Sequence, residues 1–66
     1  MPIHDEAVLR ILSEATESLF ASEIAERLNL QLRPAVAYTT IEVGRVLQRL
    51  HEQAVLLADG RWVLKP

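Results

Sequence analysis

The stretch AVLLADGRWVLK, residues 54–65, carries the clearest structural signal in the sequence. Its two apolar runs, 54–58 and 61–65, flank the pair Asp59-Gly60. An Asp-Gly pair between two apolar runs is typical of a two-residue type I′ turn. The sequence therefore predicts a C-terminal β-hairpin with strands at about 54–58 and 61–65.

A two-residue turn would also fix the register of this hairpin, placing Leu57 opposite Trp62 and Leu56 opposite Val63. One face would then be uniformly large and apolar, and would cover the helices: Val55, Leu57, Trp62 and Leu64. We interpret Trp62 as a core residue rather than a base-stacking one. Leu56 and Val63 would lie on the other face, which a monomer leaves uncovered. We expect them at a dimer or partner interface.

The residues before the hairpin, 40–53, have the periodicity of an amphipathic helix. Thr39 and Glu42 match a capping box, which places the helix N-terminus. The inward stripe follows the spacing of one buried helical face: Val43, Val46, Leu47 and Leu50. The outward face comprises Ile41, Arg45, Gln48 and Glu52. Gly44 costs up to about 1 kcal/mol relative to Ala in mid-helix, which favours a close approach by another group.

A first helix is predicted at about 4–16. Asp5 and Glu6 favour the positive end of its dipole, and its inward stripe is Val8, Ile11, Leu12 and Ala15. Residues 18–20 are apolar and β-permissive, and we expect a brief extended segment there. Phe20 is interpreted as a core residue.

A second helix is predicted at about 21–29, with Asn29 in the left-handed position that ends a helix. Residues 30–38 permit two interpretations. They form an ordered loop, or Pro34 begins a long helix that continues through the third helical stripe. We favour the loop, because the capping box begins only at Thr39.

Length and composition bound the possible classes of protein. The 66 residues weigh 7.4 kDa and leave room for one domain, residues 1–66. Half of the residues are hydrophobic and 24% are charged, a globular composition. With no cysteine, a disulfide scaffold, a Cys-ligated zinc site and a thiol nucleophile are excluded.

Membrane and enzyme functions are poorly supported. The N-terminus lacks the basic flank and apolar core of a secretory signal, and no apolar run approaches the roughly 20 residues that cross a bilayer. We therefore expect a cytoplasmic protein. His4 and His51 are the only histidines, and no phosphate-binding, zinc-protease or nucleophile-elbow motif is present. We expect no enzymatic activity, no metal site and no cofactor.

The order helix, short extended segment, helix, helix, hairpin resembles the winged helix-turn-helix superfamily. The resemblance is carried by SEIAERLNL (22–30), VGRVLQRLHEQ (43–53) and the hairpin at 55–64. These look like the second helix, recognition helix and wing of small bacterial DNA-binding regulators. The resemblance implies an α+β fold. One departure is the connection between the last two helices, because Thr39 lies nine positions beyond Leu30, whereas three or four residues are usual.

The resemblance also implies a binding mode, in which the third helix enters the major groove and the wing contacts the DNA backbone. Thr39 and Thr40 would donate to phosphate at the helix N-terminus. Arg45 and Gln48 would read guanine and adenine edges, and Ile41 would touch a thymine methyl. Phosphate contacts are implied for the remaining cations of this half: Arg33, Arg49, Arg61 and Lys65.

The net charge of −2 is the sum of two unlike halves. Residues 1–32 hold two basic and six acidic residues, a net −4, whereas residues 33–66 hold five and three, a net +2. The positive half contains the implied recognition helix and wing. Helix-surface pairs of Glu42 with Arg45 and of Arg49 with Glu52 would reduce this positive charge.

Two functions therefore remain open. The first is a sequence-specific DNA-binding protein, a transcriptional regulator acting as a homodimer because one copy offers few phosphate contacts. The second is a winged-helix module that binds another protein within a larger nucleic-acid or other assembly. The acidic average, the long connection and three outward apolar residues favour the second: Ile41, Leu56 and Val63.

Overall fold

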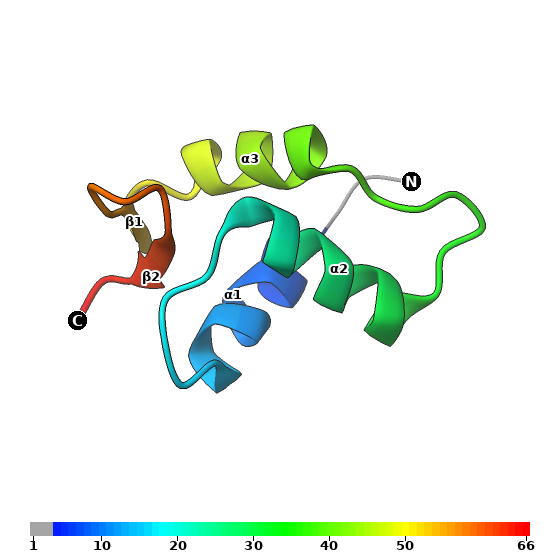
Figure 1. The fold of residues 1–66 in the computed structure, drawn as a ribbon, viewed down its shortest axis with the longest axis horizontal. Coiled ribbons are helices and arrows are strands. Elements are labelled where there is room, and N and C mark those ends of the chain that lie inside the picture. Colours follow the sequence, from blue (N-terminus) through cyan, green and yellow to red (C-terminus); the bar gives the residue numbers. More distant parts are fainter. Residues whose placement is uncertain (1–3) are drawn as a thin grey trace.

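The computed structural model describes residues 4–66 as three helices and a two-stranded antiparallel sheet (Figure 1). The elements are α1 (Asp5–Glu14), α2 (Ala21–Leu32), α3 (Thr40–Arg49), β1 (Ala54–Leu56) and β2 (Trp62–Leu64). The α+β class and the order of the elements are as predicted. The predicted bounds differ: α1 and α3 stop short of 16 and 53, α2 runs past 29, and both strands are shorter than predicted.

α1 has its two acidic residues in the first turn and buries Val8, Ile11 and Leu12, as its spacing predicts. The chain then reaches Leu19, whose backbone pairs with that of Trp62 in β2. The Leu19 N–H donates to the Trp62 carbonyl at 3.0 Å, and the Trp62 N–H donates to the Leu19 carbonyl at 2.7 Å. The predicted extended segment thus forms a single isolated β-bridge to β2.

α2 begins at Ala21, where the Glu23 carboxylate accepts a hydrogen bond from the Phe20 N–H at 2.9 Å. The predicted end at Asn29 is wrong, because the helix continues to Leu32. Arg33 then adopts the left-handed conformation, with φ of 46°, and its N–H donates to the Asn29 carbonyl at 3.0 Å. Pro34 accounts for the end of α2 at Leu32, because a proline disfavours the right-handed helical conformation at the residue before it, here Arg33.

Residues 33–39 form a loop, which confirms the favoured interpretation for this part of the stretch, whereas residues 30–32 belong to α2. The Asn29 side chain binds the backbone of Tyr38 through both of its polar atoms. Tyr38 packs against the core. At Thr39 the predicted capping box is present: its hydroxyl accepts from the Glu42 N–H at 3.2 Å, and the Glu42 carboxylate accepts from the Thr39 N–H at 3.2 Å.

α3 buries the predicted stripe, but it ends at Arg49. The Leu50 carbonyl then accepts hydrogen bonds from the N–H groups of Gln53 and Ala54, each at 2.9 Å. This tight turn replaces the last predicted helical turn and leads directly into β1. It therefore shortens α3 and aims the hairpin back toward α1.

The predicted hairpin register is wrong by one residue. β1 and β2 pair Ala54 with Leu64, Val55 with Val63 and Leu56 with Trp62. The connection has three residues, 58–60, rather than two. The Leu57 N–H donates to the Arg61 carbonyl at 2.7 Å, and Gly60, with φ of 92°, donates its N–H to the Leu57 carbonyl at 3.0 Å. A turn followed by a left-handed glycine is the usual form of a three-residue hairpin loop.

This shift changes which residues share a face, because successive side chains of a strand alternate. Leu56 shares a face with Trp62, and Val63 shares the other with Val55. The predicted pairing of Leu56 with Val63 on one outer face is therefore wrong. Trp62 and Leu64 do pack against the core, as predicted.

One apolar core joins all the elements. α2 packs against both α1 and α3, while β2 contacts α1. The core consists of Val8, Ile11, Leu12, Leu19, Ile24, Ala25, Leu28, Val43, Val46, Leu47, Leu50 and Ala54. The hairpin and the α2–α3 loop lie at opposite ends of the long axis (Figure 1). None of the helices within residues 4–66 combines the length and the apolar character needed to cross a membrane.

Candidate functional site

The outer face of α3 presents a ridge made of Ile41, Arg45 and Gln48. The buried stripe of α3 lies on the opposite side, so packing against α2 holds this ridge outward. Ile41 is 68% exposed, and Arg45 and Gln48 are exposed as well. Within residues 4–66 neither polar side chain of the ridge forms a hydrogen bond or an ion pair. Their donors are therefore available to a ligand.

Arg49 lies on the flank of α3 and forms an ion pair with Asp5, at the start of α1. The two side chains are 60% and 43% exposed, so water screens the pair and its contribution to stability is small. The local pairs considered from the sequence, Glu42 with Arg45 and Arg49 with Glu52, do not form among the described residues. The sequence offered no signal for Asp5, which is 44 positions from Arg49.

Thr39 and Thr40 differ in their availability, although both were predicted to donate to a phosphate. The Thr39 hydroxyl accepts from the Glu42 N–H and lies 3.1 Å from a carboxylate oxygen of Glu42, to which it donates. The Thr39 hydroxyl is therefore already engaged in capping α3. Thr40 is the first residue of α3 and is exposed. Of the two hydroxyls, that of Thr40 is the one open to a ligand.

Arg61 lies beside the hairpin loop and is held from two sides. Its guanidinium carbon is 4.9 Å from the centroid of the Phe20 ring, and Nη1 is 3.7 Å from Oδ2 of Asp59. Phe20 was predicted to be a core residue, which is wrong: its side chain is 38% exposed and forms a platform for Arg61. The Phe20 ring and Asp59 thus orient the Arg61 guanidinium, but the Asp59 carboxylate already balances part of its charge.

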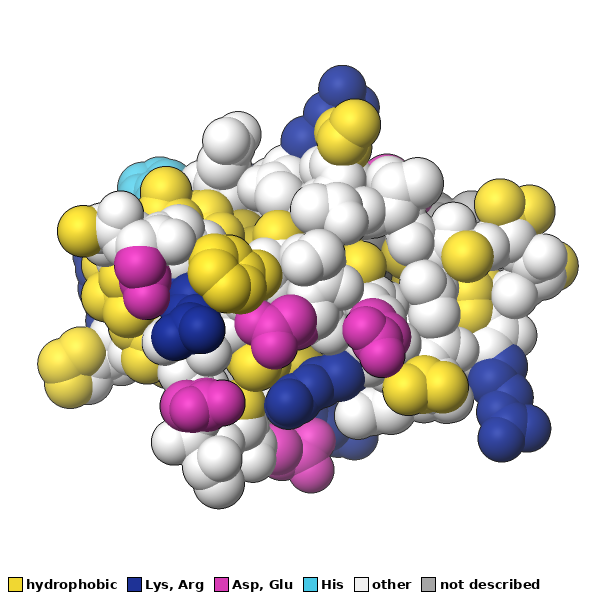
Figure 2. Space-filling view, in the orientation of Figure 1, with side chains coloured by type: hydrophobic (Ala, Val, Ile, Leu, Met, Phe, Trp, Pro, Cys, Tyr) yellow, Lys and Arg dark blue, Asp and Glu magenta, His cyan; other side chains and the backbone are white. Residues whose placement is uncertain are grey.

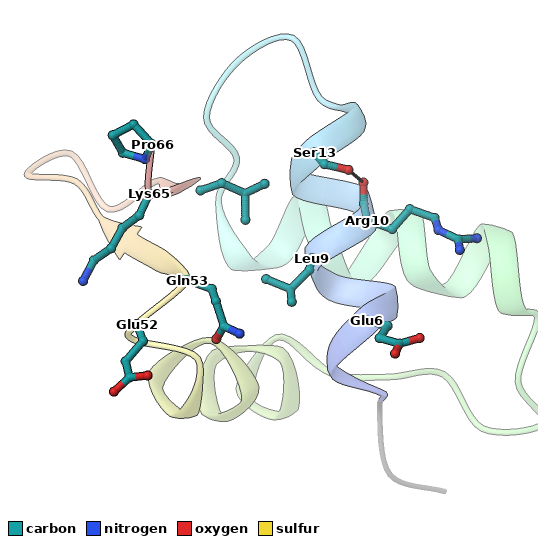
Figure 3. A pocket seen from close by; sticks show the side chains of 9 residues that line it. Glu6, Leu9, Arg10, Ser13, Glu52, Gln53, Lys65 and Pro66 are labelled. Atoms are coloured by element: carbon teal, nitrogen blue, oxygen red, sulfur yellow. Dashed lines mark hydrogen bonds between the residues drawn. The ribbon is translucent and has the colours of Figure 1, made fainter.

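Arg33 and Lys65 do not join the α3 ridge. Arg33 ends α2 at the loop end of the molecule. Lys65 lies at the base of the hairpin, where its N–H donates to the Gln53 carbonyl at 2.9 Å. It lines a groove between α1 and residues 52–53, with Glu6 and Leu9 among the side chains opposite (Figure 3). The groove carries charges of both signs, so it offers no consistent site for an anion.

Apolar side chains are exposed at both ends of the molecule (Figure 2). At the hairpin Leu56 is 54% exposed, and Leu57 and Val63 are exposed too. At the opposite end Val36 is 82% exposed in the α2–α3 loop, beside Leu32 at the end of α2. Val36 is thus an apolar loop residue whose side chain points away from the core.

Residues 4–66 contain no group of three or more His, Asp or Glu side chains that could hold a metal ion. The candidate site is a surface formed by the α3 ridge, flanked by Thr40 at its start and by Arg49 on one side. Comparisons with protein-family models, with curated proteins and with solved structures find no match to this chain.

Proposed function

We propose that this protein is a winged helix-turn-helix DNA-binding domain that acts as a transcriptional regulator and reads a short DNA sequence with α3. The order of the elements supports this proposal, because α3 packs across α2 and leads into a hairpin. The bridge between Leu19 and Trp62 ties that hairpin to the segment before α2. In such domains the third helix enters the major groove, and the wing lies along the neighbouring backbone.

One observation carries the proposal: Arg45 and Gln48 stand on the same ridge with all of their side-chain donors free. Arg pairs with the O6 and N7 of guanine, and Gln with the N6 and N7 of adenine. Three residues of helix advance about 4.5 Å, which lies between one and two base-pair steps of about 3.4 Å. The ridge is therefore suited to reading neighbouring base pairs, with Ile41 next to a thymine methyl.

The charge of the site supports a homodimer. Arg45 is free, but Arg49 and Arg61 are already paired with carboxylates. One copy then neutralises few phosphates, and each phosphate contact contributes strongly to affinity. Two copies double that number and fix the spacing of the half-sites. Leu56 and Val63 lie on opposite faces of the hairpin, so a second copy packed on one face would cover only one of them. Leu56, the more exposed of the two, is the apolar group that a second copy would cover.

The test is a selection of bound sequences from a random DNA pool, followed by titrations at several salt concentrations. Arg45→Ala should weaken binding to the selected sequence by about 1–3 kcal/mol, or roughly 5- to 150-fold. Arg10→Ala is the matched control, because Arg10 is an exposed arginine of α1 and the change in net charge is the same. Its binding should stay close to that of the wild type. If the pool yields no salt-sensitive complex, the proposal is wrong.

The exposed apolar residues favour a second candidate, a module that binds another protein. Leu56, Leu57 and Val36 are exposed without any polar function of their own. Leu56→Asp separates the two candidates when DNA affinity and association are both measured. Under the first it weakens self-association and leaves the base preference intact. Under the second it abolishes capture of a stoichiometric protein partner from the native cell, and Arg45→Ala does not.

A further inference from the structure

Gly44 has no structural reason to be glycine inside this molecule. It lies in the middle of α3 with an ordinary negative φ, since Gly60 is the only glycine recorded with a positive φ in the described chain. A Cβ added at Gly44 would meet nothing within 4 Å. Neither of the usual requirements for glycine, a left-handed backbone or tight internal packing, applies here. Alanine would fit and would favour the helix.

Gly60 provides the contrast within the same chain. Its φ is 92°, and a Cβ there would lie 3.5 Å from the Phe20 ring. The hairpin loop therefore requires Gly60, whereas the fold does not require Gly44. Glycine also marks places where another molecule approaches the backbone closely. A glycine that lowers helix stability and is not required by the fold therefore indicates contact with another molecule.

Three of the four helix neighbours of Gly44 belong to the candidate site. On a helix, positions three and four apart are adjacent. Gly44 therefore has Thr40 and Gln48 four positions away, and Ile41 and Leu47 three positions away. Thr40, Ile41 and Gln48 are exposed, whereas Leu47 is buried, so Gly44 lies at the edge of the outer face. The missing side chain leaves a notch at the edge of the outer face of α3, bordered by Ile41 and Gln48 of the ridge.

We propose that Gly44 sets how deeply α3 enters the major groove, by letting the DNA contact the helix backbone at this notch. This inference rests on the proposed DNA binding. Arg45 and Gln48 reach the base edges only when the helix axis is close enough for their donors. A side chain at position 44 would hold the helix away from the groove floor, so both contacts would lengthen together. Gly44 is thus a positioning residue for sequence readout.

The experiment compares Gly44→Ala and Gly44→Leu with the wild type, measuring urea unfolding and DNA binding on the same preparations. We expect both variants to have a higher urea midpoint than the wild type, since each replaces glycine by a better helix former. We also expect Gly44→Ala to bind the selected sequence about 10-fold more weakly, and Gly44→Leu more weakly still. Affinity for unrelated DNA should change little, because phosphate contacts carry it.

The outcomes separate the two proposals. If the wild type binds no DNA, the proposed function fails and the notch has no role. If the wild type binds a selected sequence and both variants bind it equally tightly, DNA recognition stands and the role of Gly44 is wrong. If Gly44→Ala lowers the urea midpoint, the glycine serves the fold itself, which also overturns the inference. A stabilised variant that loses only specific binding supports it.

Discussion

Asn29 holds Tyr38 with both ends of its side-chain amide. Its Nδ2 donates to the Tyr38 carbonyl at 3.1 Å, and its Oδ1 accepts from the Tyr38 N–H at 2.7 Å. Both residues are partly buried. The contact joins α2 to the last turn of the loop before α3, so one side chain fixes where the exposed helix begins. It also explains how a seven-residue connection stays ordered.

Asn29→Ala should lower the free energy of unfolding by about 1–3 kcal/mol, because it leaves a partly buried N–H and carbonyl of Tyr38 without partners. Urea unfolding measures the loss, and hydrogen exchange at the Tyr38 amide should accelerate. Gln31→Ala is the control, since Gln31 is exposed two positions away on α2. An equal effect of the two substitutions would mean that the amide of Asn29 contributes nothing specific.

Thr39→Ala should lower the free energy of unfolding by about 0.5–2 kcal/mol, because the hydroxyl caps α3 through the Glu42 N–H. Thr40→Ala should leave stability nearly unchanged, since Thr40 has no capping role. Thermal unfolding followed by circular dichroism compares the two directly. For DNA binding the order should reverse, with Thr40→Ala weakening a phosphate contact more directly than Thr39→Ala. Equal stability of both variants would contradict the assignment of the cap.

Asp5→Asn should strengthen DNA binding, because it releases Arg49 from its ion pair. If Arg49 then contacts one more phosphate, the plot of log affinity against log salt becomes steeper by about 0.9. Stability should change by less than about 1 kcal/mol, as expected for an exposed pair. The measurement is fluorescence anisotropy across a salt series, with Glu6→Gln as the control for the change in net charge. A slope equal to that of the control would show that Arg49 stays out of reach.

Gly60→Ala should destabilise the protein by about 1–2 kcal/mol, because the left-handed backbone at this position is unfavourable for any residue with a Cβ. Gly60→Asn should cost less, since asparagine tolerates left-handed conformations. Chemical unfolding of the wild type and the two variants should show stability decreasing in the order glycine, asparagine, alanine at position 60. If alanine and asparagine are equally tolerated, the loop adopts another turn in solution.

The elements that local spacing determines were predictable from the sequence. The buried residues of α3 recur at helical intervals, and the Thr39 cap is recognised from Glu42 three positions later. A few neighbouring residues therefore suffice to place both features. The start of α2 and the existence of a hairpin follow in the same way.

The hairpin register was not predictable, for a physical reason. Asp59-Gly60 is compatible with two- and three-residue loops, and both place an apolar face toward the helices. The choice between them involves pairing of Trp62 with Leu19, which lies far away in the sequence. The same limit applied to Arg49, whose partner Asp5 is on another helix. Asn29 was predicted to end α2 because asparagine is common at helix ends, whereas its side chain instead binds the backbone of Tyr38 nine positions later.

The bridge between Leu19 and Trp62 has a consequence for the folding kinetics. Closing it joins residues 43 positions apart in a chain of 66, and contacts of such sequence separation slow folding relative to local ones. Trp62 is the single tryptophan of the chain. Its fluorescence therefore reports the closure of this long-range contact, while circular dichroism follows the local formation of the helices. Coincident time courses from the two probes would identify two-state folding, and a lag in fluorescence would reveal helices that form before the ends of the domain are joined.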